Sequence, residues 1–179
     1  MTAKQQGFTL IEIMLVLVVI GVMASMLAVS LGDNAQKQLD REARRLQVSL
    51  QMVADEAVMQ GGEFALAIGR DASKDSNGYQ FLLLDPERLV WSALNDKLFA
   101  FHPLSSAISI DVALAGGDDP QFSRQLERLQ SLDNQQGPEP LLLLLSSGEI
   151  TPFVITLNHQ ELSEPVRLAS DGISGVELR

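Results

Sequence analysis

The hydrophobic positions are concentrated near the amino terminus. No charged residue lies between Ile13 and Gly32, and Ser25 is the one polar side chain inside this run before the terminal Ser30. A helix of this length crosses about 30 Å of hydrocarbon. A helix buried in a soluble core would carry a polar stripe with a period of 3.6 residues, and this run has none. The pattern therefore predicts a membrane-spanning helix over about residues 8–31.

A removable secretory signal is the other interpretation of such a run. Ala28-Val29-Ser30 would serve as a cleavage site for a signal peptidase. The apolar part of a secretory signal is about 7 to 15 residues long, however, and this run is longer. The run is therefore interpreted as a segment that the mature protein keeps.

The helix is predicted to continue beyond the membrane. Apolar residues recur at alternating spacings of four and three, the pattern of one helix face, at Leu39, Ala43, Leu46, Leu50, Val53 and Ala57. Gly61-Gly62 is typical of a helix end, so the element spans residues 8–60 and measures about 80 Å. Because no domain of this size buries 80 Å of helix, half of it must project. Gly32-Asp33-Asn34 is a weak point where a kink or local unwinding is expected.

After Gly62 the hydrophobic period changes to two, which predicts a strand over residues 64–68. Further strands are predicted where short β-like runs are separated by Gly, Pro, Asn and Asp, at residues 79–84, 98–101, 108–114, 141–145, 153–157, 166–168 and 173–178. Seven or eight strands exceed one small sheet. We therefore expect an α+β fold in which two antiparallel sheets of a domain spanning residues 61–179 pack on the helix stripe.

Residues 116–140 form an insertion within this β pattern. Asp119 followed by Pro120 is typical of a helix start, and Phe122, Leu126 and Leu129 mark one face of a short helix. The insertion is either a contact element that projects from the domain or a helix that covers a sheet.

Glu12 places a carboxylate inside the apolar segment, which effectively begins at Phe8. A charge in a membrane helix costs about 2.5 to 3.5 kcal/mol and usually has a partner. Lys4 is one candidate partner. A second is a new amino terminus made by cutting the chain before Phe8, one helical turn from Glu12 or close to the Glu12 of a neighbouring copy. The plain alternative is a carboxylate that reaches the membrane interface.

The residues around Glu12 resemble the signal of type IV prepilins. Lys4-Gln5-Gln6-Gly7-Phe8-Thr9-Leu10-Ile11-Glu12 has the basic leader ending in Gly, the Phe that follows and the acid four positions later. The resemblance implies that a prepilin peptidase removes residues 1–7 by cutting between Gly7 and Phe8 and methylates the amino group of Phe8. It also implies that Glu12 sets the register of assembly.

The remainder of the chain is similar to the H-type minor pseudopilins of type II secretion, the GspH/FimT group. Ser147-Gly148-Glu149-Ile150-Thr151-Pro152 before Phe153 resembles the Gly-containing turn that precedes a strand in that group. The chain lacks both the proline in the membrane helix and the paired carboxy-terminal cysteines of many type IV pilins. The resemblance thus implies a pilin-like fold and favours a pseudopilin over an adhesive pilin.

Composition and motifs argue against most other functions. A formal charge of −10 disfavours nucleic-acid binding, and the absence of cysteine excludes disulfides and thiolate chemistry. His102 and His159 have no neighbouring ligand at a suitable spacing, and the Ser73–Gly78 segment lacks the acid that would complete a calcium loop, so no metal is expected and an Asn77-Gly78 hairpin turn is predicted instead. No nucleophile elbow or phosphate-binding loop is present, so neither catalysis nor a cofactor is expected.

The resemblance implies a single-pass protein of the bacterial inner membrane whose carboxy-terminal domain lies in the periplasm and joins the tip of a pseudopilus. The implied partners are other minor pseudopilins, the major pseudopilin, the prepilin peptidase and the inner-membrane assembly platform. A minor type IV pilin that primes fibre assembly or aids DNA uptake, and a membrane-tethered periplasmic enzyme, are the alternatives. More basic residues follow the predicted span than precede it, where Lys4 stands alone, and this count favours a cytoplasmic carboxy-terminal domain. We give the prepilin-like leader more weight than this count.

Overall fold

A single long helix dominates the architecture. The computed structural model describes residues 10–71, 76–94, 96–115 and 139–179, without the side chains of residues 24–33, 70 and 71. Helix α1 (Leu10–Gln60) has 51 residues and is unbroken. The local unwinding predicted at Gly32-Asp33-Asn34 is therefore wrong, because a glycine penalty of about 1 kcal/mol is small beside continuous helical hydrogen bonding on both sides.

The helix ends where the glycine pair predicts. Gly61 adopts a φ of 65°, which a residue without Cβ reaches at no steric cost. The amide of Gly62 donates a hydrogen bond to the carbonyl oxygen of Ala57 at 3.2 Å. This arrangement satisfies a free carbonyl group at the helix end and turns the chain into the first strand.

The first sheet has the strand order β3-β2-β1-β6, with β4 also paired to β2. All of its pairings are antiparallel. Its strands are β1 (Phe64–Asp71), β2 (Ser76–Asp85), β3 (Val90–Ala93), β4 (His102–Pro103) and β6 (Leu142–Leu144). One face of this sheet contributes to the main core, and the other holds a smaller apolar cluster around the buried Trp91.

The second sheet is also antiparallel and has the order β5-β7-β8-β9. Its strands are β5 (Ile108–Leu114), β7 (Phe153–His159), β8 (Val166–Ser170) and β9 (Glu177–Leu178). In β7 the residues alternate between buried and half-buried, as expected for a strand with one face on a core. The expected two-sheet α+β fold is confirmed.

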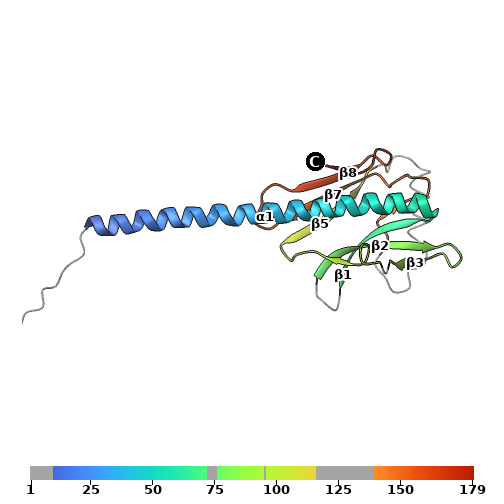
Figure 1. Ribbon diagram of the computed structural model, residues 1–179, viewed down its shortest axis with the longest axis horizontal. Coiled ribbons are helices and arrows are strands. Elements are labelled where there is room, and N and C mark those ends of the chain that lie inside the picture. The colour runs from blue at the N-terminus through green and yellow to red at the C-terminus, as the bar shows by residue number, and fades with distance from the viewer. Residues whose placement is uncertain (1–9, 72–75, 95, 116–138) are drawn as a thin grey trace, which may run out of the picture.

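Both sheets contact α1, and Figure 1 shows β7 and β8 on one side of its carboxy-terminal half and β1, β2 and β3 on the other. The predicted helix stripe is fully confirmed, since each of its members is at most 1% exposed: Leu39, Ala43, Leu46, Leu50, Val53 and Ala57. These side chains pack with residues of both sheets in one core. The helix is therefore the element that joins the two sheets.

The chain crosses from the first sheet to the second at the Gly-containing turn before β7. Gly148 has a φ of 90°, and its amide donates to the carbonyl oxygen of Leu145. The amide of Leu143 donates to the buried hydroxyl oxygen of Thr151 at 3.0 Å, and the amide of Thr151 donates back to the Leu143 carbonyl oxygen at 2.9 Å. These reciprocal bonds hold the crossing in place.

The strand prediction is wrong in four places. Strand β4 was not predicted, and of the predicted strand at 173–178 only residues 177 and 178 lie in β9. The other two differences have local causes. Residues 98–101 form a turn, because Asp96 accepts hydrogen bonds from the amides of Leu98, Phe99 and Ala100 through its side chain and carbonyl. The short strand β3 was not predicted. A turn precedes β3, and in it the Asp85 carboxylate accepts hydrogen bonds from the amides of Glu87 and Arg88. This turn is the local signal from which the start of β3 could have been predicted.

Asn77-Gly78 lies within β2 and not in a hairpin turn. Gly78 pairs with Gly69 across the sheet, so the β1–β2 connection falls at residues 72–75, outside the described residues. A Cβ on Gly78 would lie 2.3 Å from the carbonyl oxygen of His102. The glycine therefore permits the close approach of β4. The predicted insertion helix within residues 116–140 also falls almost entirely outside the described residues.

We expect Leu50→Ala to destabilise the protein by about 2 to 5 kcal/mol, because it leaves a cavity between the helix and both sheets. Val48→Ala, two residues away on the exposed face, should change the free energy of unfolding by less than about 0.5 kcal/mol. Urea unfolding of the full chain in detergent, followed by circular dichroism, measures both. Equal effects of the two substitutions would contradict the assignment of the packed face.

Candidate functional site

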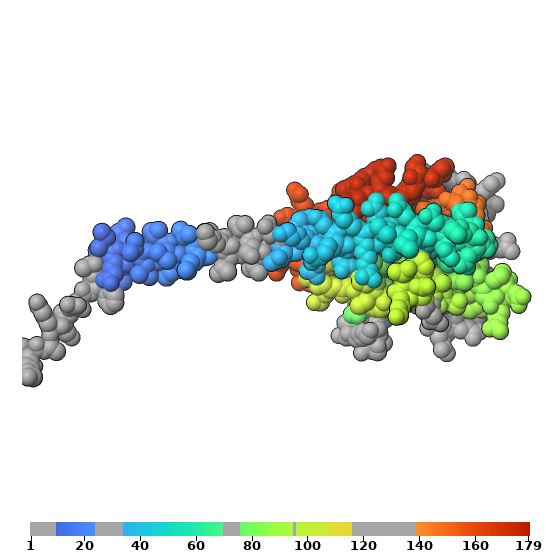
Figure 2. All heavy atoms as spheres, in the orientation of Figure 1, coloured from blue at the N-terminus to red at the C-terminus, as the bar shows by residue number. Residues whose placement is uncertain are grey.

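The first part of α1 projects from the domain, and its apolar side chains from Leu10 to Met23 are uncovered. Figures 1 and 2 show this part of the helix as a rod that extends beyond the two sheets. Twelve large apolar side chains between Leu10 and Met23 are exposed, and each is between 48% and 79% accessible. Isolated exposed apolar residues are normal, but a continuous surface of this kind marks a site of contact with a protein or a membrane.

Glu12 lies at the start of this apolar surface. It occupies the first turn of the described helix and is exposed. A carboxylate near a helix amino terminus is favoured by the helix dipole, which supplies part of a positive partner. The two other predicted site residues, Gly7 and Phe8, lie outside the described residues. The proposed pairing of Glu12 with the amino group of Phe8 therefore stays a prediction.

Among the residues that the structure describes, no helix meets the combined requirement of length and hydropathy for crossing a membrane.

The other half of the helix is tied to the domain by polar contacts as well as by the core. Nε2 of His102 in β4 lies 2.8 Å from Oε2 of Glu42, and the two side chains are 17% and 22% exposed. Farther along, the Gln47 side-chain amide donates to the carbonyl oxygen of Val176 at 2.8 Å. These bonds link α1 to the first sheet and to the segment before β9. They fix the rotation of the helix relative to the domain.

Tyr79 lies next to His102 in the first sheet. Its ring centroid lies 5.2 Å from that of His102. Burial raises the pKa of the Tyr79 hydroxyl to about 12, partly opposed by the positive charge of Arg45. Tyr79 is therefore neutral at physiological pH, which is the state expected of a structural tyrosine at a helix–sheet interface.

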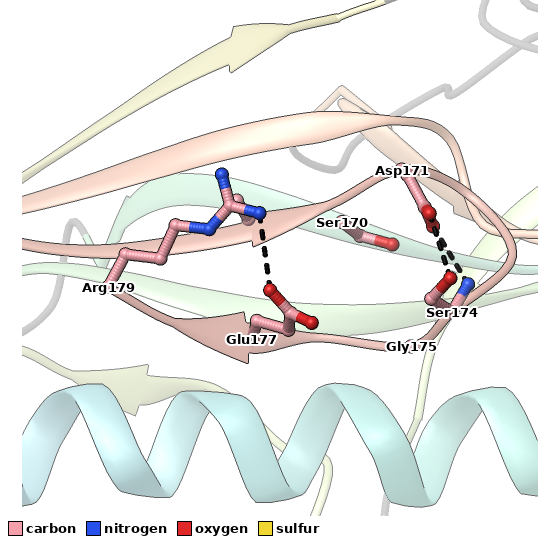
Figure 3. A pocket seen from close by; sticks show the side chains of 7 residues that line it. Ser170, Asp171, Ser174, Gly175, Glu177 and Arg179 are labelled. Carbon is pink, nitrogen blue, oxygen red and sulfur yellow. Dashed lines mark hydrogen bonds and ion pairs between the residues drawn. The ribbon is translucent and has the colours of Figure 1, made fainter.

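A small hollow of about 80 Å³ lies beside the β8–β9 loop and is drawn in Figure 3. The Asp171 carboxylate accepts hydrogen bonds from the amides of Ile173 and Ser174 and from the Ser174 hydroxyl. The bonds from Ser174 and Ile173 lower the pKa of Asp171 to about 2. The Asp171 carboxylate thus orders the β8–β9 loop. These hydrogen bonds explain the position of the carboxylate without a bound ligand.

The described residues contain no cluster of three or more His, Asp or Glu side chains that could hold a metal ion. His102 is engaged by Glu42, and Nδ1 of the buried His159 accepts from the amide of Glu161. The sequence left open whether the two histidines are solvated or locally bonded, and the structure shows a local bond for His159. It missed the pairing of His102 with Glu42, because the two residues are far apart in the chain and only the folded sheet brings them together.

A long amino-terminal helix, packed over its second half against antiparallel sheets and apolar over its exposed first half, defines the pilin-like class. The comparisons with known proteins agree. Residues 2–28 match the prokaryotic N-terminal methylation motif, and residues 42–172 match the family described as type II transport protein GspH. Because the second match covers well over half of the chain, the protein belongs to the GspH family.

Curated relatives extend over nearly the whole chain. The type II secretion system protein H of Pseudomonas aeruginosa is 32% identical, with 93% of this chain and 91% of the relative covered. The protein of the same description from Aeromonas hydrophila is 29% identical over 88% of this chain and 83% of its own length. The crystal structure of the minor pseudopilin EpsH from Vibrio cholerae superimposes with a TM-score of 0.59 at 24% identity, over 79% of this chain and 93% of that one. This last likeness concerns the fold.

The pH dependence of stability tests the role of Asp171. Since the folded pKa of about 2 lies below the ordinary value of 3.8, its contribution is fully present above about pH 4 and is lost as the pH falls through 2. We expect Asp171→Asn to be less stable than the parent chain at pH 6 and equal to it at pH 2, by urea unfolding. Asp55→Asn, at an exposed helix position, is the control. A parent advantage that persists undiminished at pH 2 would rule out this role.

Proposed function

We propose that this chain is stored in the bacterial inner membrane as a single-pass protein and is then built into the tip region of the type II secretion pseudopilus. Its role is that of a minor pseudopilin in protein secretion, a structural subunit of the secretion machinery. In this proposal residues 1–7 are a leader, residues 8–60 form the helix with a membrane segment at about 8–31, and residues 61–179 are the periplasmic domain.

The exposed apolar half of α1 is the observation that carries the proposal. Its twelve large apolar side chains between Leu10 and Met23 are each between 48% and 79% accessible. Burial of one such side chain is worth about 1.5 to 3 kcal/mol, so removing this surface from water is worth on the order of 20 kcal/mol. A bilayer provides such a medium before assembly, and the apolar helices of neighbouring subunits provide it afterwards at little hydrophobic cost.

Glu12 gives this otherwise uniform surface a defined register. In the proposed processing, the prepilin peptidase cuts between Gly7 and Phe8, and the new N-methylated amino group of Phe8 carries a positive charge. That charge lies one turn from Glu12 of the same chain and within reach of Glu12 in an adjacent subunit. A misplaced subunit would leave a charge unpaired in an apolar medium, which costs several kcal/mol. The correct stagger is therefore favoured.

The proposed partners follow from this arrangement. The helix contacts the other minor pseudopilins and the major pseudopilin within the filament. Before that, the prepilin peptidase acts on the Gly7–Phe8 bond, and the inner-membrane assembly platform receives the processed subunit. The acidic β domain lies outside the helical core of the filament, where its surface is open to other subunits at the tip.

A Glu12→Leu substitution tests the register. We expect the variant to reach the membrane and be processed, but to be absent from isolated pseudopili, with secretion reduced at least about tenfold in a strain that lacks the native subunit. In the variant the amino group of Phe8 has no carboxylate partner, and a charge left unpaired in an apolar medium costs several kcal/mol, which accounts for such a decrease.

Glu87→Leu, which removes an exposed carboxylate from the turn before β3, is the matched control and should assemble normally. Quantitative immunoblots of sheared filaments and culture supernatants give both readouts. If Glu12→Leu enters filaments and supports secretion as the parent chain does, Glu12 does not set the register.

A further inference from the structure

Three basic side chains form a stripe on the outward face of α1, immediately beyond its apolar half. Lys37, Arg41 and Arg44 are all exposed. At 100° per residue they fall within an arc of about 60°, directly opposite the buried stripe that includes Leu39 and Leu46. We call these three residues the basic stripe. Arg45, also exposed, lies at its edge.

The basic stripe has no acidic partner among the described side chains. The carboxylate of Asp40 accepts a hydrogen bond from the side-chain amide of Gln36 at 3.0 Å, and that of Glu42 is engaged by His102. No described carboxylate oxygen lies within 4.0 Å of the three cations. The stripe is therefore available to an external anion.

The stripe is a local exception in an acidic protein. Residues 33–45 carry four basic and three acidic side chains, whereas residues 46–179 carry eight basic and nineteen acidic ones. The positive charge is thus gathered next to the apolar helix segment. In the proposed topology it lies on the periplasmic side, where basic residues oppose the usual orientation of a membrane helix. This placement calls for a compensating interaction at that surface.

The distances along the helix fit the lipid headgroup layer. Lys37 lies about 8 Å beyond Gly32, the last residue of the uncharged run, and Arg44 about 18 Å beyond it. The headgroup region is about 5 to 8 Å thick on each side of the hydrocarbon, and the long side chains of Lys and Arg can extend back toward it. Electrostatic attraction reaches about a further 8 Å at physiological ionic strength.

We propose that the basic stripe binds the phosphate groups of anionic phospholipids at the periplasmic surface of the inner membrane. This inference rests on the proposed storage of the subunit in that membrane. The contact holds the base of the domain at the bilayer, while repulsion between the same lipids and the acidic remainder keeps the β sheets away. Extraction of the subunit into the filament then requires these contacts to break.

The test uses the full chain in phosphatidylcholine vesicles that contain a trace of spin-labelled phosphatidylglycerol or spin-labelled phosphatidylcholine. The fraction of each lipid that the protein immobilises, measured by electron paramagnetic resonance, gives the selectivity. We expect phosphatidylglycerol to be preferred about fivefold or more, since each cation near the surface contributes about this factor. About 0.5 M NaCl should reduce the preference by screening.

The triple variant Lys37→Gln, Arg41→Gln and Arg44→Gln should lose the preference. Its matched control, Arg88→Gln, Lys97→Gln and Arg167→Gln, removes three exposed cations from the β domain and should retain it. Preference that survives in the stripe variant, or that disappears equally in the control, would overturn the inference. If the stripe variant keeps its lipid preference and no longer self-associates in pure phosphatidylcholine, the stripe binds the acidic surface of another subunit. That outcome would also overturn the inference.

Resistance of the same samples to alkaline carbonate extraction separates this inference from the proposed function. A chain that is extracted does not reside in the bilayer, and the storage step itself is then wrong. A chain that stays in the vesicles without any preference for phosphatidylglycerol leaves the storage step intact and refutes the lipid contact alone.

Discussion

An apolar helix surface that its own domain leaves uncovered is the constraint on which the rest of this molecule depends. The large apolar side chains from Leu10 to Met23 are exposed and cannot remain in water without a large cost in free energy. The chain is therefore incomplete as an isolated soluble molecule. It needs a surrounding medium of lipid or of other helices, and the proposed function supplies both.

The second half of α1 converts that requirement into a defined orientation. Its buried stripe packs with both sheets at once, and the Glu42–His102 contact and the bond from Gln47 to Val176 prevent the helix from rotating. Because α1 is unbroken, whatever fixes the apolar half also positions the β domain. The helix thus has three zones: an exposed apolar zone, which we propose serves anchoring and assembly, an exposed basic zone, which we propose lies at the membrane surface, and a packed zone that carries the domain.

Much of this arrangement could be predicted from the sequence, because periodic patterns report local geometry. The spacing of Leu39 to Ala57 identified the packed face, and Gly61-Gly62 identified the helix end. The interpretation failed where a contact distant in the chain decides the conformation. Gly78 looks like a turn residue until β4 is seen to cross it, and no local signal pairs His102 with Glu42. Residues 98–101 are a different case, because local hydrogen bonds to Asp96, and no distant contact, make them a turn.

The central claim is that the mature chain begins inside the motif, with an amino group placed to neutralise Glu12. Mass spectrometry of the amino-terminal peptide, taken from bacteria with and without the prepilin peptidase, tests it most directly. The account predicts a peptide that begins at N-methylated Phe8 when the peptidase is present and one that retains the leader when it is absent. A chain that keeps residues of the leader in both strains would contradict it.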